Sequence, residues 1–122
     1  MWHLNPFKYN RRPTTQVKIG SLKLGSEFSV RVQSMANTDT NDVENSVAQG
    51  IRIIEAGADL VRYTTQGIRE AESAGLIKEG IRAKGFYTPL VADIHFNANA
   101  ADVAARNVEK VRINPGNYVG SV

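Results

Sequence analysis

Strand and helix patterns alternate along most of this chain, and that alternation leaves few folds open. Short apolar runs are separated by segments with the spacing of amphipathic helices. Strands that alternate with helices form parallel sheets through right-handed crossovers. The pattern therefore predicts an α/β fold with four parallel strands. The expected strands are 28–35, 59–65, 89–96 and 110–114, and the expected helices are 41–57, 67–84 and 97–108.

A short β-hairpin is expected before the first strand, because residues 16–25 alternate apolar and polar side chains around Gly20-Ser21. No glycine-rich G-x-G-x-x-G turn follows that strand, so a dinucleotide-binding sheet is poorly supported. A complete (β/α)₈ barrel needs about 200 residues, whereas this chain has 122. The pattern alone leaves two arrangements, a small open α/β sheet or half of a (β/α)₈ barrel.

Positive charge gathers at the start of the chain. Residues 1–13 are expected to form a basic arm, and residues 14–122 to form the folded domain. Aromatic residues in the arm make a nucleic-acid-binding module one alternative function, although such charge runs more often solvate a terminus. The sequence has neither an apolar run of membrane-spanning length nor a signal-peptide pattern, so a cytoplasmic location is expected.

The sequence contains no cysteine. That composition excludes disulfides, thiolate zinc sites and cysteine nucleophiles within these residues. It also means that this chain by itself supplies no cysteine ligand to an iron–sulfur cluster.

Polar residues stand toward the carboxyl end of every expected strand, where barrels and open parallel sheets bind ligands. Residues at alternate strand positions share a face, so Asp93 is expected beside His95 and Arg112 beside Asn114. Two arginines that converge on one point suit a phosphate or diphosphate, because the guanidinium fork matches those oxygens. The residues concerned are Gln33, Ser34, Arg62, Asp93, His95, Arg112 and Asn114.

Other interpretations of these residues stay open. Arg62 can serve only as a buried ion-pair partner of Asp93 that ties two strands together. Asp93 and His95 can form a two-ligand metal site, which would favour a metal-dependent hydrolase or aldolase. Gln33 and Ser34 can simply end the first strand and cap its turn.

Four blocks of the sequence resemble the 4-hydroxy-3-methylbut-2-enyl diphosphate synthase family. In this chain the second block is most similar to the three-domain type of that family. The resemblance implies the N-terminal half of a TIM barrel preceded by a short hairpin. It implies an iron–sulfur oxidoreductase that reductively opens 2-C-methyl-D-erythritol 2,4-cyclodiphosphate in isoprenoid biosynthesis. The blocks are VQSMANTDTNDVENSV, AGADLVRYTTQGIREA, LVADIHFN and KVRINPGNY, in that order.

The resemblance also implies a site. Residues matching Arg62, Asp93, His95, Arg112 and Asn114 surround the substrate in the barrel mouth, and the two arginines grip its diphosphate. It implies no catalytic residue or metal ligand in this chain.

Cofactor and partners are implied in the same way. A four-iron–four-sulfur cluster is held in a further domain of the whole enzyme, and ferredoxin or flavodoxin supplies its electrons. The chain is expected to lack the later strands and that domain, to bind no cluster, to be inactive alone and to form a homodimer, with neither nucleic acid nor membrane as partner.

The sequence departs from the family pattern at Ala36, where threonine is more usual, which weakens a role for that loop's hydroxyl. Gly50 and Gly80 also stand inside expected helices, where better helix formers are usual.

Overall fold

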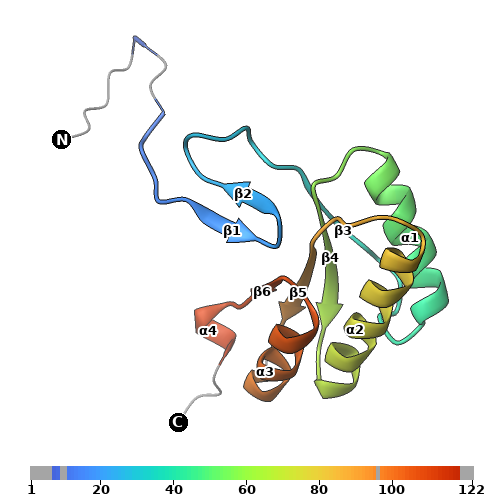
Figure 1. Cartoon of the computed structure of the whole chain (residues 1–122). Coiled ribbons are helices and arrows are strands. Elements are labelled where there is room, and N and C mark those ends of the chain that lie inside the picture. Colours follow the sequence, from blue (N-terminus) through green and yellow to red (C-terminus); the bar gives the residue numbers. More distant parts are fainter. Residues whose placement is uncertain (1–6, 9–10, 96, 119–122) are drawn as a thin grey trace.

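A four-stranded parallel sheet forms the centre of the molecule, with a two-stranded antiparallel hairpin beside it (Figure 1). The computed structural model describes residues 7–8, 11–95 and 97–118. Sequential strands are also spatial neighbours, so the predicted half-barrel order and the predicted hairpin are both confirmed. The strands are β1 (Val17–Ile19), β2 (Leu22–Leu24), β3 (Gln33–Met35), β4 (Leu60–Thr65), β5 (Leu90–Ile94) and β6 (Lys110–Arg112).

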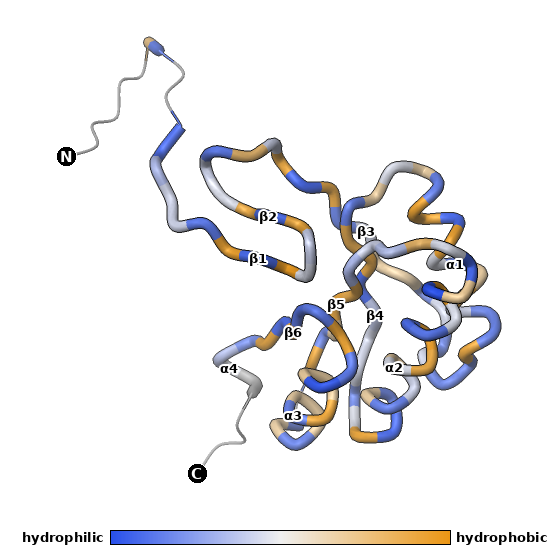
Figure 2. The backbone as a smooth tube through the Cα atoms, viewed as in Figure 1, coloured by the Kyte–Doolittle hydropathy of each residue, from blue (hydrophilic) through white to orange (hydrophobic). Residues whose placement is uncertain are grey.

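Helices cover one face of the parallel sheet (Figure 1). The main core lies between this face and the helices, and Figure 2 shows the hydrophobic residues along β5 within it. None of the helices in the described ranges is long and apolar enough to cross a membrane. The helices are α1 (Val43–Glu55), α2 (Ile68–Ala83), α3 (Ala98–Asn107) and the short α4 (Pro115–Tyr118).

The hairpin covers the amino-terminal end of the opposite face. Ile19 is buried against Leu60 and Val91, and Leu22 packs beside them. Leu60 and Val91 alternate along their strands with residues of the main core, so they lie on the face that becomes the inside of a barrel. The hairpin thus fills the amino-terminal end of this face and leaves the carboxyl-terminal end free for a site.

Glu109 ties α2 to the amino-terminal end of the sheet. Its carboxylate accepts hydrogen bonds from Leu90 N–H (3.0 Å) and Arg82 Nη2 (2.5 Å), and pairs with Lys78 Nζ at 3.2 Å. Burial acts to raise the pKa of Glu109, but the Leu90 hydrogen bond and the Lys78 charge outweigh it and hold that pKa below its ordinary value. This partly buried carboxylate is therefore fully paired and structural.

Two strand boundaries differ from expectation. The strand expected from residue 28 begins only at Gln33. Before it, Val32 O still accepts backbone hydrogen bonds from Asp59 N–H (2.8 Å) and Leu60 N–H (3.2 Å), and side chains hold the rest of the segment. Arg31 Nε donates to Lys23 O at 2.9 Å, and Val32 N–H donates to the Asp59 carboxylate at 2.9 Å. The last strand ends at Arg112, two residues before the turn into α4.

Three details of the helices differ from what their sequence patterns predict. Asn41 with Glu44 three residues on predicts an N-cap at Asn41, but Asp42 caps α1, and its side chain accepts from Asn45 N–H at 3.3 Å. The apolar spacing of α2 predicts a buried Ile68, which is 42% exposed at the first position of the helix. The alanine spacing of α3 predicts a buried Ala105, whereas Ala100 and Ala104 are buried and Ala105 is exposed.

Two glycines inside helices permit close packing. A Cβ at Gly50 would overlap the hydroxyl of Tyr63, which donates to Ser46 O at 2.8 Å. Burial raises the pKa of Tyr63 well above its usual range, so this hydroxyl stays protonated. A Cβ at Gly80 would lie 2.7 Å from Val47 Cγ2 on α1. The apparent weak points of these helices are therefore the places where α1 meets β4 and α2.

Gly50→Ala should destabilise the chain although alanine is the better helix former. The overlap with Tyr63 should cost about 1–3 kcal/mol, more than the ~1 kcal/mol gained in helix propensity. Denaturant unfolding of Gly50→Ala, Tyr63→Phe and the double variant measures the coupling between the two sites. The double variant should be more stable than additivity predicts, and strict additivity would contradict this packing.

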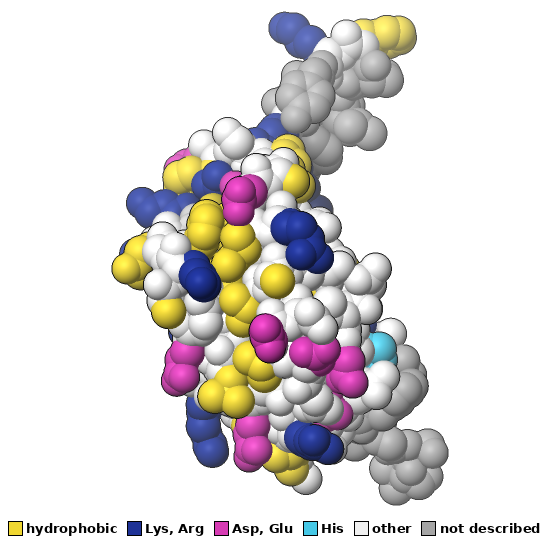
Figure 3. Space-filling model, turned by 90° about the vertical axis from the view of Figure 1, so that its right-hand side faces the viewer, with side chains coloured by type: hydrophobic (Ala, Val, Ile, Leu, Met, Phe, Trp, Pro, Cys, Tyr) yellow, Lys and Arg dark blue, Asp and Glu magenta, His cyan; other side chains and the backbone are white. Residues whose placement is uncertain are grey.

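Both edges of the parallel sheet are open within the described residues, and apolar side chains are exposed along them. Val32, Met35 and Ile113 are 55%, 44% and 41% exposed at or beside the edge strands β3 and β6. Figure 3, which views the molecule from the right-hand side of Figure 1, shows further hydrophobic side chains gathered on that side. Unpaired edges with apolar side chains promote association.

We expect the 122-residue chain to self-associate through these edges. Light scattering across a tenfold concentration range should give a mass above the monomer. Val32→Lys should lower that mass, because a lysine next to the edge strand β3 opposes pairing, whereas Val17→Lys on the hairpin should not. A compact monomer at every concentration would refute the expectation.

Candidate functional site

Arg62, Asp93 and Arg112 meet on the free end of the sheet face that the hairpin leaves open. Asp93 in β5 is in register with Arg112 in β6 and with Thr64 in β4. Arg62 lies two residues before Thr64 and so shares its face. Because β5 has a strand on each side, Asp93 is only 2% exposed. Three neighbouring strands thus bring one buried carboxylate and two cations together.

Each oxygen of Asp93 holds a different arginine. Arg62 Nη2 lies 2.7 Å from Asp93 Oδ2, and Arg112 Nη1 lies 3.1 Å from Asp93 Oδ1. The arginine side chains are 25% and 42% exposed, against 3% for the aspartate. The ion pair of the structural interpretation is therefore present, and a second one accompanies it.

Most hydrogen-bond donors of the two arginines remain available. A guanidinium group carries five N–H donors, and Asp93 engages one terminal nitrogen of each arginine. Arg62 Nε is buried and has no hydrogen-bond partner within the described part of the chain. With two cations against one carboxylate, the cluster carries excess positive charge and unused donors, which favours an anion.

His95 and Asn114 extend the cluster toward the end of the sheet. His95 Nε2 lies 3.6 Å from Asp93 Oδ2, longer than a hydrogen bond, with the imidazole 36% exposed. Asn114 Oδ1 accepts from Gly116 N–H at 3.0 Å, which fixes the turn into α4. The amide NH₂ of Asn114 is left as a donor.

Gln33 and Ser34 do not join this group. They pair with Leu60 and Val61 near the amino-terminal end of β4, and adjacent strand residues point to opposite faces. β3 continues to Met35, which is in register with Arg62. The alternative interpretation, in which Gln33 and Ser34 end the first strand and cap its turn, is therefore wrong.

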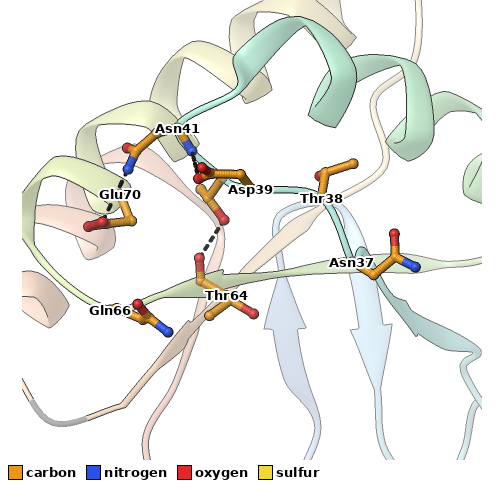
Figure 4. Close-up of a pocket in the computed structure, with 8 residues that line it drawn as sticks. Asn37, Thr38, Asp39, Asn41, Thr64, Gln66 and Glu70 are labelled. Atoms are coloured by element: carbon orange, nitrogen blue, oxygen red, sulfur yellow. Dashed lines mark hydrogen bonds between the residues drawn. The ribbon is translucent and has the colours of Figure 1, made fainter.

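A polar pocket of about 450 Å³ lies at the carboxyl ends of β3 and β4, and sequence reasoning missed it (Figure 4). Thr40 Oγ1 donates to Thr64 O, and Asn41 donates to both Asp39 and Glu70, so the two loops are joined. The polar run after β3 was the available signal, since loops at this end of a parallel sheet carry function. The pocket is lined by Asn37, Thr38, Asp39, Thr40, Asn41, Thr64, Gln66 and Glu70.

Ala36 lies outside this pocket. It is 5% exposed, belongs to the main core, and donates its N–H to Arg62 O at 2.8 Å. The departure from the family pattern at this position therefore falls in the core and not among the site's polar groups.

The geometry bears on both alternative functions, a metal-dependent hydrolase or aldolase and a nucleic-acid-binding module. Both oxygens of Asp93 face arginines, and the described residues contain no group of three or more His, Cys, Asp or Glu that could hold a metal. Arg11 of the expected arm donates to Phe28 O (2.7 Å) and Gly25 O (3.1 Å), so its guanidinium is engaged by the hairpin loop. The arm's Trp2 and Tyr9 lie outside the described residues.

Comparison with known proteins places this arrangement in a family. A relative from Parabacteroides distasonis is 58% identical over 116 residues, which are 95% of this chain and 19% of that protein. Relatives from Phocaeicola vulgatus and Chlamydia felis are 57% and 51% identical over 93% and 95% of the chain, and 18% and 20% of their own lengths. All three are named 4-hydroxy-3-methylbut-2-en-1-yl diphosphate synthase (flavodoxin).

The chain therefore spans about a fifth of the length of these curated relatives. Its residues 14–121 match the GcpE TIM-barrel domain, which includes the hairpin, the parallel sheet and the arginine cluster. On that match and these identities, the chain belongs to the GcpE family.

Proposed function

We propose that the cluster around Asp93 binds the diphosphate of 2-C-methyl-D-erythritol 2,4-cyclodiphosphate. The observation that carries the proposal is one buried carboxylate holding two guanidinium groups from flanking strands. Asp93 orients both arginines, and their unused N–H groups can each contact phosphate oxygens as charge-assisted pairs. Substrate binding then needs little rearrangement, because the cations are already fixed.

His95 and Asn114 would complete the contacts at the open end of the sheet. A neutral imidazole can donate one hydrogen bond to an oxygen of the substrate, and the Asn114 amide can donate another. The polar pocket beside Thr64 offers hydroxyl, amide and carboxylate groups. These groups suit the hydroxyl-bearing carbon part of a methylerythritol ligand.

The reaction proposed for the whole protein is the one in the relatives' names, with flavodoxin or ferredoxin as electron donor and an iron–sulfur cluster as cofactor. The residues of this chain do not fit the cluster, because they include no cysteine. Its ligands would lie outside these 122 residues. We propose that this chain contributes substrate binding and does not turn over the substrate alone.

Replacing Arg62 or Arg112 with alanine should weaken substrate binding. Each loses charge-assisted hydrogen bonds of about 1.5–3 kcal/mol, which corresponds to roughly a 10- to 100-fold rise in Kd. Calorimetric titration with the cyclodiphosphate measures this, both on the chain and on a hybrid carrying the remaining length of the Parabacteroides distasonis relative. Lysine variants should recover only part of the affinity, because they keep the charge but lose the fork.

Melting temperatures of the same Arg62→Ala protein separate binding from structure. If Arg62 only neutralises Asp93, its loss leaves a buried charge unpaired and lowers the melting temperature without changing Kd in the folded protein. That result would refute the diphosphate role. Weaker binding with little loss of melting temperature would support it, since Arg112 still neutralises Asp93.

Asp93→Asn should have opposite effects on the free and the ligand-bound protein. Without its charge the two arginines repel each other, and stability should fall by about 3 kcal/mol, or less because both arginines reach solvent. A bound diphosphate supplies the missing negative charge, so it should raise the melting temperature of the variant more than that of the parent. An equal or smaller ligand shift would argue against an anion at this place.

A further inference from the structure

Lys110, the first residue of β6, lies on the same face of the sheet as Arg112. The two residues are separated by one position, so their side chains point to the face that carries Asp93. Sequence reasoning did not select Lys110, because it stands at the beginning of its strand and not at the end. The register of the sheet nevertheless relates Lys110 to the arginine cluster.

Lys110 and Arg62 occupy equivalent places on opposite sides of β5. Arg62 is in register with Val91 from the β4 side, and Lys110 is in register with the same Val91 from the β6 side. Both therefore flank the position two residues before Asp93. The two strands that flank β5 thus each place a long basic residue level with the same position of β5.

The reach of Arg62 shows what a long side chain can do from this position. Its backbone pairs with Val91, yet Nη2 lies 2.7 Å from the carboxylate of Asp93, one row higher. Successive residues on one face of a strand are about 6.6 Å apart, a span that the four-carbon stem of lysine covers. The ammonium of Lys110 can thus reach the level of Asp93 and Arg112.

Lys110 is half-buried and takes part in no ion pair among the described residues, unlike Lys78, which pairs with Glu109. Partial burial removes some of the water around the Lys110 ammonium, which costs free energy. A negatively charged ligand beside the ammonium would offset that cost. We infer that Lys110 is a third cation of the anion site and contacts the substrate diphosphate together with Arg62 and Arg112.

Charge balance supports this assignment, which rests on the proposed function. Each phosphate of a cyclic diphosphate is bonded to two carbon- or phosphorus-bearing oxygens and carries one negative charge, so the ligand is a dianion. Arg62, Lys110 and Arg112 against Asp93 leave two positive charges. The two arginines with Asp93 would neutralise only one charge of the ligand.

The test compares Lys110→Met with Lys84→Met, which removes one exposed lysine at the end of α2. Calorimetric titration with the cyclodiphosphate, and with inorganic pyrophosphate as a second probe, is done on the chain and on the hybrid at two salt concentrations. Lys110→Met should raise Kd roughly 3- to 10-fold at low salt and by less at high salt, because salt screens a partly exposed contact. Lys110→Arg should keep most of the affinity, and Lys84→Met should change nothing.

Stability distinguishes this role from a structural one. Because Lys110 has no carboxylate partner among the residues that the structure describes, Lys110→Met should melt at the same temperature as the parent or higher. An unchanged Kd for Lys110→Met, beside a raised Kd for Arg112→Ala, would overturn the inference and leave the diphosphate proposal in place. A lower melting temperature with unchanged Kd would also overturn it. Unchanged binding in all three cation variants would refute the proposed function itself.

Discussion

The buried carboxylate of Asp93 determines how the open end of this sheet is built. A charge at 3% side-chain exposure on β5 must be neutralised by neighbours, and the two flanking strands are close enough to supply them. β4 and β6 each supply one arginine, and each arginine donates to a different oxygen of Asp93. The need to pair one negative charge thus fixes two cations in place and directs their remaining donors to the open face.

A second, partly buried carboxylate, that of Glu109, shows why its position in the fold decides its role. Glu109 also binds two cations, but both come from α2, and a backbone N–H of β5 adds a third contact at the amino-terminal end. The hairpin residue Gly20 lies close by, with Glu109 Cγ 3.2 Å from its ideal Cβ position. The Glu109 carboxylate is thus held between α2, β5 and the hairpin. The Asp93 cluster instead lies at the carboxyl-terminal end of the sheet, away from the hairpin.

The features that depend on residue periodicity could be predicted from the sequence. Those that depend on contacts between residues far apart in the sequence could not. Alternation along strands placed Asp93 near Arg62 and Arg112, and alternation of strands with helices gave the half-barrel order. Helix propensity could not explain Gly50, since the hydroxyl that requires it belongs to Tyr63, 13 positions further along. Lys110 was missed for a related reason, because its relation to Arg62 exists only through the register of both strands with Val91.

The same register explains how a chain that spans a fifth of its relatives' length holds a coherent cation site. All three basic residues and Asp93 belong to β4, β5 and β6, which are consecutive and hydrogen-bonded to one another. No other strand is needed to set their spacing, since a parallel ladder keeps neighbouring strands about 4.8 Å apart. The proposed anion site is therefore preorganised by local strand pairing, and further strands would add contacts to it.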